Sequence, residues 1–411
     1  MSMKIFYHHG THVITPNKVH LLFDPSITTN EEMEYSEYEK KRRIEKKRKN
    51  PSYEDVDLLL ISHAHADHTD NVDYFKHLNK PYICHPITYQ IRRNWLPGVQ
   101  YAQFMGTEKN LKNVLHFENI KIECFSSGHC SGSLMFKITE NETSLLFTGD
   151  LNTQQQFIVD SAQPVSCDYL IIEGTFGDKA YTFPFARDCY KEIRSYLMQK
   201  FQTEGYRCVL IFGQGLGKNQ NLAFYLNNLQ PFTCFDSLGN PEKHKLTLIM
   251  GKQTYNYTQA HNTFFKNTYK LIDPIINESS FYEFLIPRCT VFLFTIGLYC
   301  NLSYIEKIKK RYGLYRNERD LSYELPILII SGWKNQHVQS ISNCYHTAKS
   351  IQMSSHADFP SLLTFVKKCN PKHVFVFHGH SKQFVRELKK RGIDAHDLHT
   401  SIEKKNQSKA Y

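Results

Sequence analysis

The segment His63-Ala-His65-Ala-Asp67-His68 places four side chains that can bind a metal within six residues. It follows the apolar run 56–62 (VDLLLIS), which is typical of a strand buried on both faces. In extended backbone, side chains 63 and 65 point the same way, whereas those of residues 67 and 68 diverge. One loop can therefore supply imidazoles to one ion, and a carboxylate with an imidazole to a neighbouring ion.

Such polar groups are costly to bury at a strand end unless they are paired or bound to a metal. Neutral imidazole and carboxylate ligands suit zinc and, with less selectivity, manganese or iron. The segment therefore predicts a metal site rather than a structural turn.

Two further ligand-capable residues lie at later strand ends. His129 stands between glycines in 127–132 (SGHCSG), before the strand expected at 134–137, and Asp150 ends the turn 147–150 (FTGD). Taken alone, a residue such as His129 or Asp150 is more typical of a turn or of the protein surface than of a metal site. Because they follow the 63–68 segment in this order, we expect them at the same site.

Buried strands that lead into polar loops recur along the chain, which is typical of α/β folds with function at the strand ends. Further strands are expected at 144–148, 168–172, 207–212, 327–330 and 372–377. Apolar periodicity predicts helices at 185–201, 219–227, 302–312, 360–369 and 382–391. The stretch 228–287, rich in Asn, Thr, Tyr and Phe, has mixed signals and is left without assignment.

The segments HAHADH, SGHCSG and FTGD, in this order, resemble the metallo-β-lactamase superfamily. Three later segments, 171–177 (IIEGTFG), 353–358 (MSSHAD) and 376–380 (VFHGH), resemble its β-CASP branch of nucleases. The resemblance covers about residues 5–395. It implies an αββα sandwich with an inserted α/β β-CASP domain. Residues 1–180 and 346–411 are expected to form the first and the C-terminal part of the metallo-β-lactamase domain, and residues 181–345 the inserted β-CASP domain.

The resemblance implies two Zn²⁺ ions, with Mn²⁺ or Fe as alternatives. One ion would be held by His63, His65 and His129, and the other by Asp67, His68 and His378, with Asp150 as a bridge. Metal-activated hydroxide would attack the phosphate. The catalytic residues would be Asp67, Glu173 and His356, with His356 protonating the leaving oxygen and Glu173 orienting an imidazole. Two structural alternatives remain: Glu173 could pair with a cation, and His356 could be an ordinary residue beside the helix that begins near Pro360.

Substrate signals are weaker. In the branch that the chain resembles, a histidine at the position of His378 is characteristic of RNA-processing members, which favours RNA over DNA. The glycine-rich 213–220 (GQGLGKNQ) follows a strand and opens a helix, where backbone amides can bind an anion. Substrate binding is assigned to Gly217, Lys218, Ser354 and Ser355. Lys218 stands where the family usually has Arg, the tripeptide 331–333 (SGW) replaces a usual glycine pair, and His380 replaces a customary acid.

The formal net charge of +10 bears on partners. Residues 40–49 (KKRRIEKKRK) carry +7, but residues 31–39 carry −5, which leaves +8 to be spread over the remainder. The run 31–49 fits a solvated charged helix or hairpin, and it also fits a nucleic-acid contact or a nuclear import signal. No signal peptide or membrane-spanning run is recognisable, and the 11 cysteines are scattered. We expect a cytoplasmic protein, or a nuclear one in a eukaryote, with no membrane partner and with a homodimer or a processing complex as an option.

The sequence thus predicts a zinc-dependent phosphodiesterase that hydrolyses nucleic acid, with RNA favoured, in RNA processing or decay. One alternative is a DNA exonuclease or repair-type nuclease, or another metallo-hydrolase. The other is a non-catalytic RNA-binding scaffold subunit. Scaffold members of such families usually lose metal ligands, whereas every expected ligand is present in this chain.

Overall fold

The computed structural model describes residues 2–26, 53–235, 240–280, 286–296, 302–312, 325–333 and 348–399. The charged run 31–49 lies outside the described residues. The chain divides into two compact units. Unit 1 comprises Met1–Gln154, Asp160–Thr182 and His356–Tyr411, and unit 2 comprises Gln155–Val159 and Phe183–Ser355.

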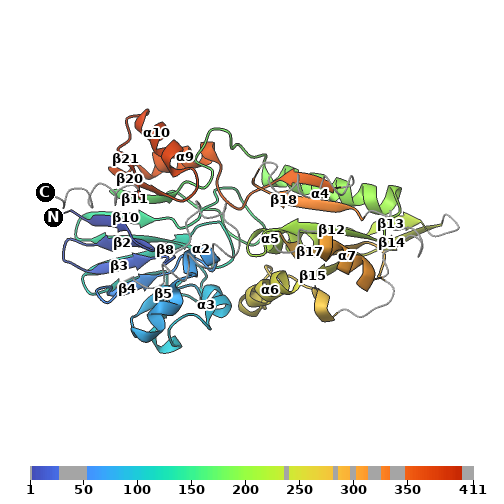
Figure 1. Ribbon diagram of the computed structural model, residues 1–411, viewed down its shortest axis with the longest axis horizontal. Helices are drawn as coiled ribbons and strands as arrows, with labels where there is room; N and C mark the ends of the chain where they lie inside the picture. The colour runs from blue at the N-terminus through green and yellow to red at the C-terminus, as the bar shows by residue number, and fades with distance from the viewer. Residues whose placement is uncertain are drawn as a thin grey trace. The chain divides into compact units, whose positions relative to one another are not determined.

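Unit 1 contains two sheets (Figure 1). The six-stranded sheet has the order β1 (Lys4–Tyr7), β2 (Thr11–Ile14), β3 (His20–Phe23), β4 (Leu58–Leu60), β5 (Tyr82–Cys84), β6 (Ala102–Phe104). The seven-stranded sheet has the order β21 (Ala395–Asp397), β20 (His373–Phe377), β11 (Tyr169–Glu173), β10 (Thr143–Phe147), β9 (Leu134–Glu140), β8 (Ile120–Ser126), β7 (Val114–Phe117).

The two sheets pack face to face because their strands alternate between buried and less buried side chains. In β8, for example, Ile120 and Ile122 are fully buried while Lys121 and Glu123 are not. Ile122 shares one core with Leu21 and Leu58 of the other sheet.

Helices cover the outer faces of the sandwich. On the seven-stranded sheet, α9 (Phe359–Cys369) and α10 (Ser381–Lys389) bury Leu362 and Leu388 against strands β11 and β20. The six-stranded sheet packs its other face against a cluster that includes Phe75 of the 3-10 helix η2 (Val72–His77). Two short helices, α2 (Ala66–Thr69) and α3 (Pro86–Arg92), follow β4 and β5, and a 3-10 helix, η3 (Val99–Tyr101), precedes β6. These layers confirm the predicted αββα sandwich.

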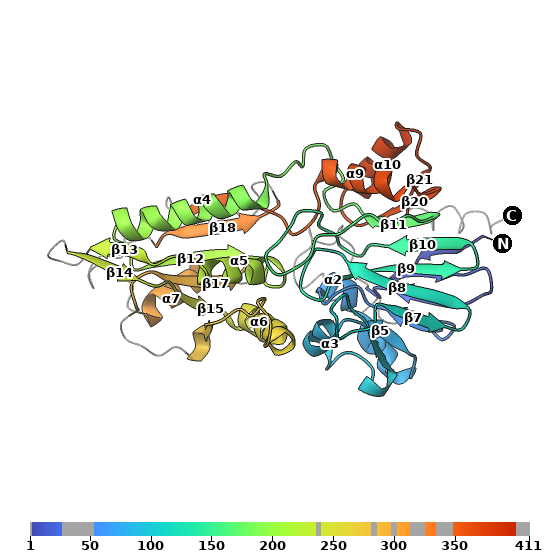
Figure 2. The same cartoon turned by 180° about the vertical axis from the view of Figure 1, so that it is seen from behind.

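Unit 2 is built on a parallel sheet (Figure 2). Its order is β16 (Ile276–Asn277), β15 (Thr247–Met250), β17 (Thr290–Thr295), β12 (Cys208–Gly213), β18 (Ile327–Ser331), β19 (Ala348–Gln352). The helices α4 (Ala186–Met198) and α5 (Lys218–Asn227) pack on one face and α7 (Leu302–Arg311) on the other. The π-helix η4 (Gln199–Thr203) continues α4. Residues 348–355, which the sequence analysis assigned to the C-terminal part of the metallo-β-lactamase domain, lie in unit 2, where β19 pairs with β18.

The unassigned stretch 228–287 contains a hairpin of β13 (Phe232–Phe235) and β14 (Pro241–His244), then β15, α6 (Lys252–Phe265), β16 and the 3-10 helix η5 (Glu278–Ser280). Helix α6 escapes sequence analysis because Thr254, Thr258 and His261 occupy buried positions, so no apolar period appears. In the parts of the chain that the structure describes, no helix has both the length and the apolar character needed to cross a membrane.

Candidate metal centre

The strand ends of unit 1 bring the predicted ligands together. His63 to His68 follow β4, Asp150 follows β10, and His378 follows β20. Strands β10, β11 and β20 are parallel neighbours, so their carboxyl ends meet at one edge of the sheet. This register places Asp150, Glu173 and His378 beside one another, although more than 200 residues separate the first from the last.

The first group of converging donors is His63, His65, His129 and Asp150. His65 Nδ1 lies 2.9 Å from His63 Nε2 and 3.0 Å from His129 Nε2. The carboxylate Oδ2 of Asp150 lies 3.5 Å from His63 Nε2 and 3.6 Å from His129 Nε2. A ring nitrogen has one hydrogen or one lone pair, so His65 Nδ1 can form at most one of its two short contacts as a hydrogen bond.

The second group is Asp67, His68 and His378, and Asp150 adjoins it. His68 Nε2 lies 3.2 Å from Asp150 Oδ2 and 4.0 Å from Asp67 Oδ2. The His68 and His378 ring centroids are 5.0 Å apart. Asp150 thus stands between the two groups.

Asp24 supports the second group and was missed by sequence analysis. Its Oδ2 accepts a hydrogen bond from His68 Nδ1 at 2.8 Å, and its Oδ1 accepts one from the backbone N–H of Ser62 at 2.6 Å. Ser62 Oγ donates to Asp24 Oδ2 and accepts from His63 Nδ1 at 2.9 Å. These bonds leave Nε2 of both histidines facing Asp150. The available signal was an Asp-Pro directly after the apolar strand 20–23, the same pattern that marks the other strand ends.

The donor set fits a metal. In a tetrahedral zinc site, Zn–N bonds of about 2.0–2.1 Å put neighbouring donor atoms about 3.3 Å apart, close to the separations in the first group. Among the described residues, the buried atoms His68 Nε2 and Asp150 Oδ1 have no hydrogen-bond partner. A cation between the groups would satisfy both atoms.

Electrostatics agree with this fit. Burial lowers the pKa of His63 well below its usual range and that of His378 to about 3, so both rings are neutral, as ligands must be. Burial also opposes charge on His68, but the carboxylates of Asp150, Asp67 and Asp24 outweigh it and raise its pKa well above the usual value. The three carboxylates therefore favour a cation at this position.

A third cluster joins Asp150, Glu173 and His356. His356 Nδ1 lies 3.1 Å from Oε1 and 3.0 Å from Oε2 of the fully buried Glu173. Glu173 Oε1 also accepts from the backbone N–H of Leu151 at 2.6 Å, which ties it to the turn of Asp150. Burial lowers the pKa of His356, but Glu173 and Asp150 outweigh this and raise it to about 8, so His356 carries a proton at neutral pH.

Comparison with known proteins supplies the family. Residues 20–190 match the β-lactamase superfamily domain, and residues 346–396 match the Zn-dependent metallo-hydrolase RNA specificity domain. The chain belongs to the β-CASP branch of the metallo-β-lactamase superfamily. The resemblance that the motifs indicated is therefore confirmed, and the clusters of histidine and aspartate described above indicate metal binding.

Three curated proteins are similar to most of this chain. It is 24% identical over 347 residues to a "Probable DNA ligase" of Opitutus terrae, covering 82% of this chain and 28% of that protein. It is 23% identical over 387 residues to the cleavage and polyadenylation specificity factor subunit 3 of Dictyostelium discoideum, covering 81% and 47%. It is 23% identical over 358 residues to an RNase J-like protein of Methanocaldococcus jannaschii, covering 80% and 82%. The chain thus spans less than half of the first two proteins.

A solved structure shares the fold at low sequence identity. The crystal structure of a protein of unknown function from Enterococcus faecalis V583 superposes with a TM-score of 0.53 and 14% identity, over 91% of this chain and 93% of that one. This likeness concerns the fold alone.

Two glycines of the motifs are required by close backbone contacts. At Gly379, which has φ of 53°, a Cβ would lie 2.3 Å from Thr175 Cα. At Gly128, with φ of 72°, a Cβ would lie 2.1 Å from the carbonyl oxygen of Asn152. Both positions let a loop that carries a candidate ligand, His378 or His129, approach its neighbour.

The residues assigned to substrate binding belong to unit 2, whereas the metal centre belongs to unit 1. Gly217 has φ of 95° and precedes α5, and its N–H donates to Gln220 Oε1 at 2.6 Å. Lys218 is buried, with Nζ 3.5 Å from the carbonyl of Ile330, and burial lowers its pKa to about 8. Ser355 Oγ donates to Gln214 Oε1 at 2.7 Å. Their substrate contacts stay a prediction.

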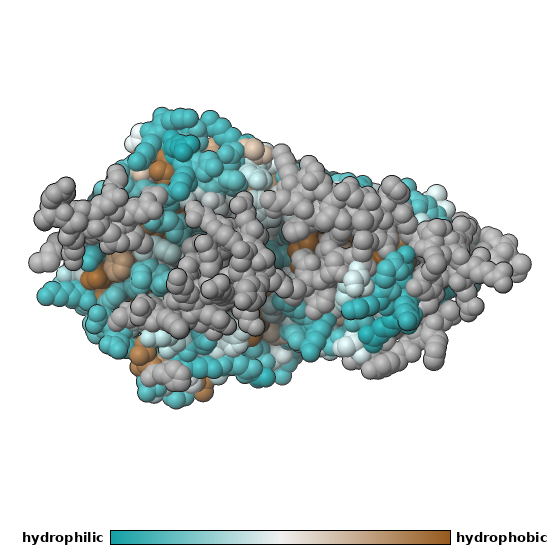
Figure 3. All heavy atoms as spheres, in the orientation of Figure 1, coloured by the Kyte–Doolittle hydropathy of each residue, from teal (hydrophilic) through white to brown (hydrophobic). Residues whose placement is uncertain are grey.

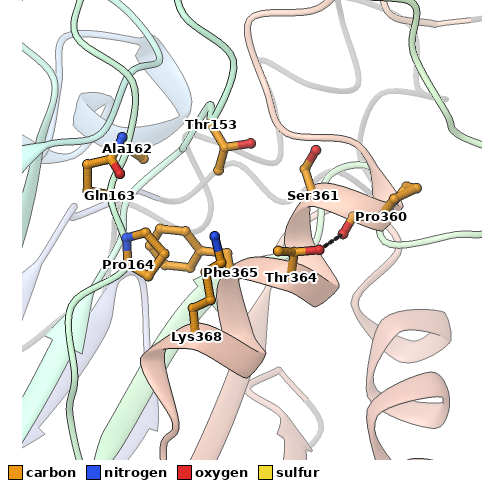
Figure 4. A pocket seen from close by; sticks show the side chains of 9 residues that line it. All are labelled: Thr153, Ala162, Gln163, Pro164, Pro360, Ser361, Thr364, Phe365 and Lys368. Carbon is orange, nitrogen blue, oxygen red and sulfur yellow. Dashed lines mark hydrogen bonds between the residues drawn. The ribbon is translucent and has the colours of Figure 1, made fainter.

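A pocket of about 340 Å³ lies within unit 1 beside α9 (Figure 4). Thr153, three residues after Asp150, contributes one wall, and Ser361, Thr364 and Lys368 of α9 contribute another. Its apolar floor includes Pro164 and Phe365, and none of its lining residues is acidic.

Proposed function

We propose that this chain is a zinc-dependent phosphodiesterase that hydrolyses RNA, in RNA processing or decay. The observation that carries the proposal is the pair of donor groups that share Asp150. One group is rich in imidazole and the other adds a second carboxylate, the composition expected of a dinuclear zinc site.

We assign His63, His65 and His129 to one Zn²⁺ and Asp67, His68 and His378 to the other, with Asp150 bridging. Mn²⁺ or Fe suits the same ligands less selectively. When bound, the two ions would supply a water of lowered pKa as the nucleophile and neutralise charge on the scissile phosphate.

The remaining steps fall to side chains of this chain. Glu173 holds Nδ1 of His356, which leaves Nε2 to deliver a proton to the leaving oxygen. The backbone N–H of Leu151 fixes Glu173 in turn, so the acid and the bridging Asp150 are held by one turn. Asp24 holds His68 in the orientation that presents Nε2.

RNA is the favoured substrate for two reasons. The matched domain at 346–396 is described as an RNA specificity domain, and two of the relatives above are named for RNA processing. His378 also agrees with the RNA-processing pattern of the branch. A cytoplasmic location, a nuclear one in a eukaryote, and assembly as a homodimer or in a processing complex are parts of the same proposal.

The test is cleavage of end-labelled single-stranded RNA and DNA of one sequence, with metal analysis of the same preparation. We expect about two equivalents of zinc and cleavage of RNA. An Asp67/His68 double alanine variant should cleave neither strand. Cleavage of DNA alone would replace RNA by the DNA-nuclease alternative, which the similarity to a protein named DNA ligase supports. A chain that binds RNA but no zinc would be a scaffold subunit.

A further inference from the structure

In addition to residues 40–49, a second dense run of positive charge lies in the C-terminal part of the sequence. Residues 359–393 contain one acidic residue, Glu387, and eight basic ones: Lys367, Lys368, Lys372, Lys382, Arg386, Lys389, Lys390 and Arg391. The segment therefore carries +7 of the net +10. The sequence analysis left +8 to be spread over the chain outside residues 31–49, whereas most of that charge lies here.

The fold displays this charge on one layer. Helices α9 and α10 lie side by side on the seven-stranded sheet, with Phe359 and Phe384 ring centroids 6.1 Å apart (Figures 1 and 2). Their apolar stripes, which include Leu362 and Leu388, face the sheet. The basic side chains point outward as a consequence, and the surface over α10 is hydrophilic in Figure 3.

Local acidic groups do not cancel this charge. Glu387 is already engaged by Lys179 at 3.0 Å, Lys390 at 2.9 Å and Arg391 at 2.8 Å. Among the residues that the structure describes, the exposed side chains of Lys367, Lys368, Arg386 and Lys389 have no ion pair. We call these four the basic helix surface.

The two helices that carry the surface begin near the metal centre. Helix α9 starts three residues after His356, and α10 starts three residues after His378. Both helices run away from the centre, so their last turns lie about 15 Å along the helix axis from it. Between α9 and the loop after Asp150 lies the pocket of Figure 4, which Lys368 and three hydroxyl side chains line.

We propose that the basic helix surface binds the sugar-phosphate backbone of the RNA, outside the nucleotide that is cleaved. A dense, uncompensated cationic layer fits a polyanion, and lysine and arginine contacts to phosphate supply sequence-independent affinity. Because these residues lie far from the metal centre, we expect them to contribute to RNA affinity and not to the chemical step. The inference rests on the proposed function for the identity of the polyanion.

The test is the quadruple variant Lys367→Gln, Lys368→Gln, Arg386→Gln, Lys389→Gln. Binding of a labelled single-stranded RNA is followed by fluorescence anisotropy at several salt concentrations, with the full chain in a His356→Ala background so that turnover is suppressed. We expect Kd to rise roughly ten- to hundredfold at low salt, and the slope of log K against log salt to fall by about 0.7 for each lost contact. A matched variant neutralises the exposed Lys4, Lys18, Lys109 and Lys112, which lie outside α9 and α10, and should change neither quantity.

Hydrolysis of bis-p-nitrophenyl phosphate, a diester too small to reach the surface, separates the two proposals. With His356 intact, the quadruple variant should hydrolyse it at the unaltered rate while its KM for RNA rises. The proposal would be overturned if the quadruple variant and the matched lysine variant had the same RNA affinity and the same salt slope. So would binding to anionic lipid vesicles with no binding to RNA, or a loss of thermal stability without a change in RNA affinity. If the unaltered chain hydrolyses neither RNA nor the small diester, the proposed function fails, whatever the binding data show.

Discussion

His68 Nδ1 lies 2.8 Å from Asp24 Oδ2 in a buried hydrogen bond between residues 44 positions apart. The bond fixes the ring so that Nε2 faces Asp150. It also adds negative charge behind a ring that must give up its proton to bind a metal. Asp24 is therefore a positioning residue for the metal centre.

Asp24→Asn tests this role. The asparagine amide is uncharged, and its NH2 group can face the Nδ1–H of His68 without accepting a hydrogen bond. Metal affinity should therefore fall about 10- to 100-fold while the fold is retained. Competition with a chromophoric chelator measures the affinity. Asp57→Asn is a matched control, because Asp57 accepts a backbone N–H from His20 outside the donor groups. Equal affinity in the two variants would contradict the role of Asp24.

His378→Ala should lower the metal content from about two equivalents to about one, because only one of the two groups contains His378. RNA cleavage should fall about 100-fold or more, since the remaining ion lacks its partner. Elemental analysis gives the stoichiometry. His380→Ala, two residues further on, belongs to no donor group among the described residues and should keep both ions. Two retained ions in His378→Ala would remove His378 from the ligand set.

His356→Ala should lower kcat about 10²- to 10⁴-fold with unchanged metal content, because His356 is assigned as the general acid. Glu173→Gln should lower kcat less, about 10- to 100-fold, since it removes only the group that orients His356. Rapid-quench kinetics with parallel metal analysis distinguish these effects. Should His356→Ala lose metal, His356 would be a ligand, as its contact with Asp150 at 3.9 Å would then indicate.

Metal binding at pH 7 should release protons. The carboxylates of Asp150, Asp67 and Asp24 outweigh burial and raise the pKa of His68, so the metal-free ring is protonated at neutral pH and must lose its proton to become a ligand. Calorimetry in buffers of different ionisation enthalpy counts the protons. Release should diminish as the pH rises above the raised pKa and the free ring becomes neutral. A titration enthalpy independent of the buffer would contradict this linkage.

Removal of the metal should abolish RNA cleavage and lower the thermal midpoint, because an ion that binds only the folded chain stabilises it. At a free zinc concentration about 100 times Kd, the stabilisation is about 2.7 kcal/mol for a single site. Chelator treatment followed by readdition of Zn²⁺ or Mn²⁺, with cleavage and melting measured in the same samples, tests both effects. Unchanged cleavage in the metal-free chain would contradict a metal-dependent mechanism.

Local sequence was sufficient for some features and insufficient for others. The apolar runs before His63 and Asp150 were long enough to predict β4 and β10, because strands buried on both faces need few polar residues. Helix α6 could not be predicted in this way, because its buried positions carry threonine and histidine that bond within the fold, as the Thr258 hydroxyl does to the Thr254 carbonyl.

The sequence by itself was sufficient to recognise the superfamily and its branch by resemblance, and the resemblance implied the layered fold. Each motif is a short local arrangement of ligand-capable residues after a strand, so it can be recognised without the structure. The tertiary structure alone decided that Asp24 supports His68, that Glu173 holds His356, and that the positive charge forms one helical layer. These are contacts between segments distant in sequence. Strand register and helix packing set them, and neither can be read from the spacing of residues along the chain.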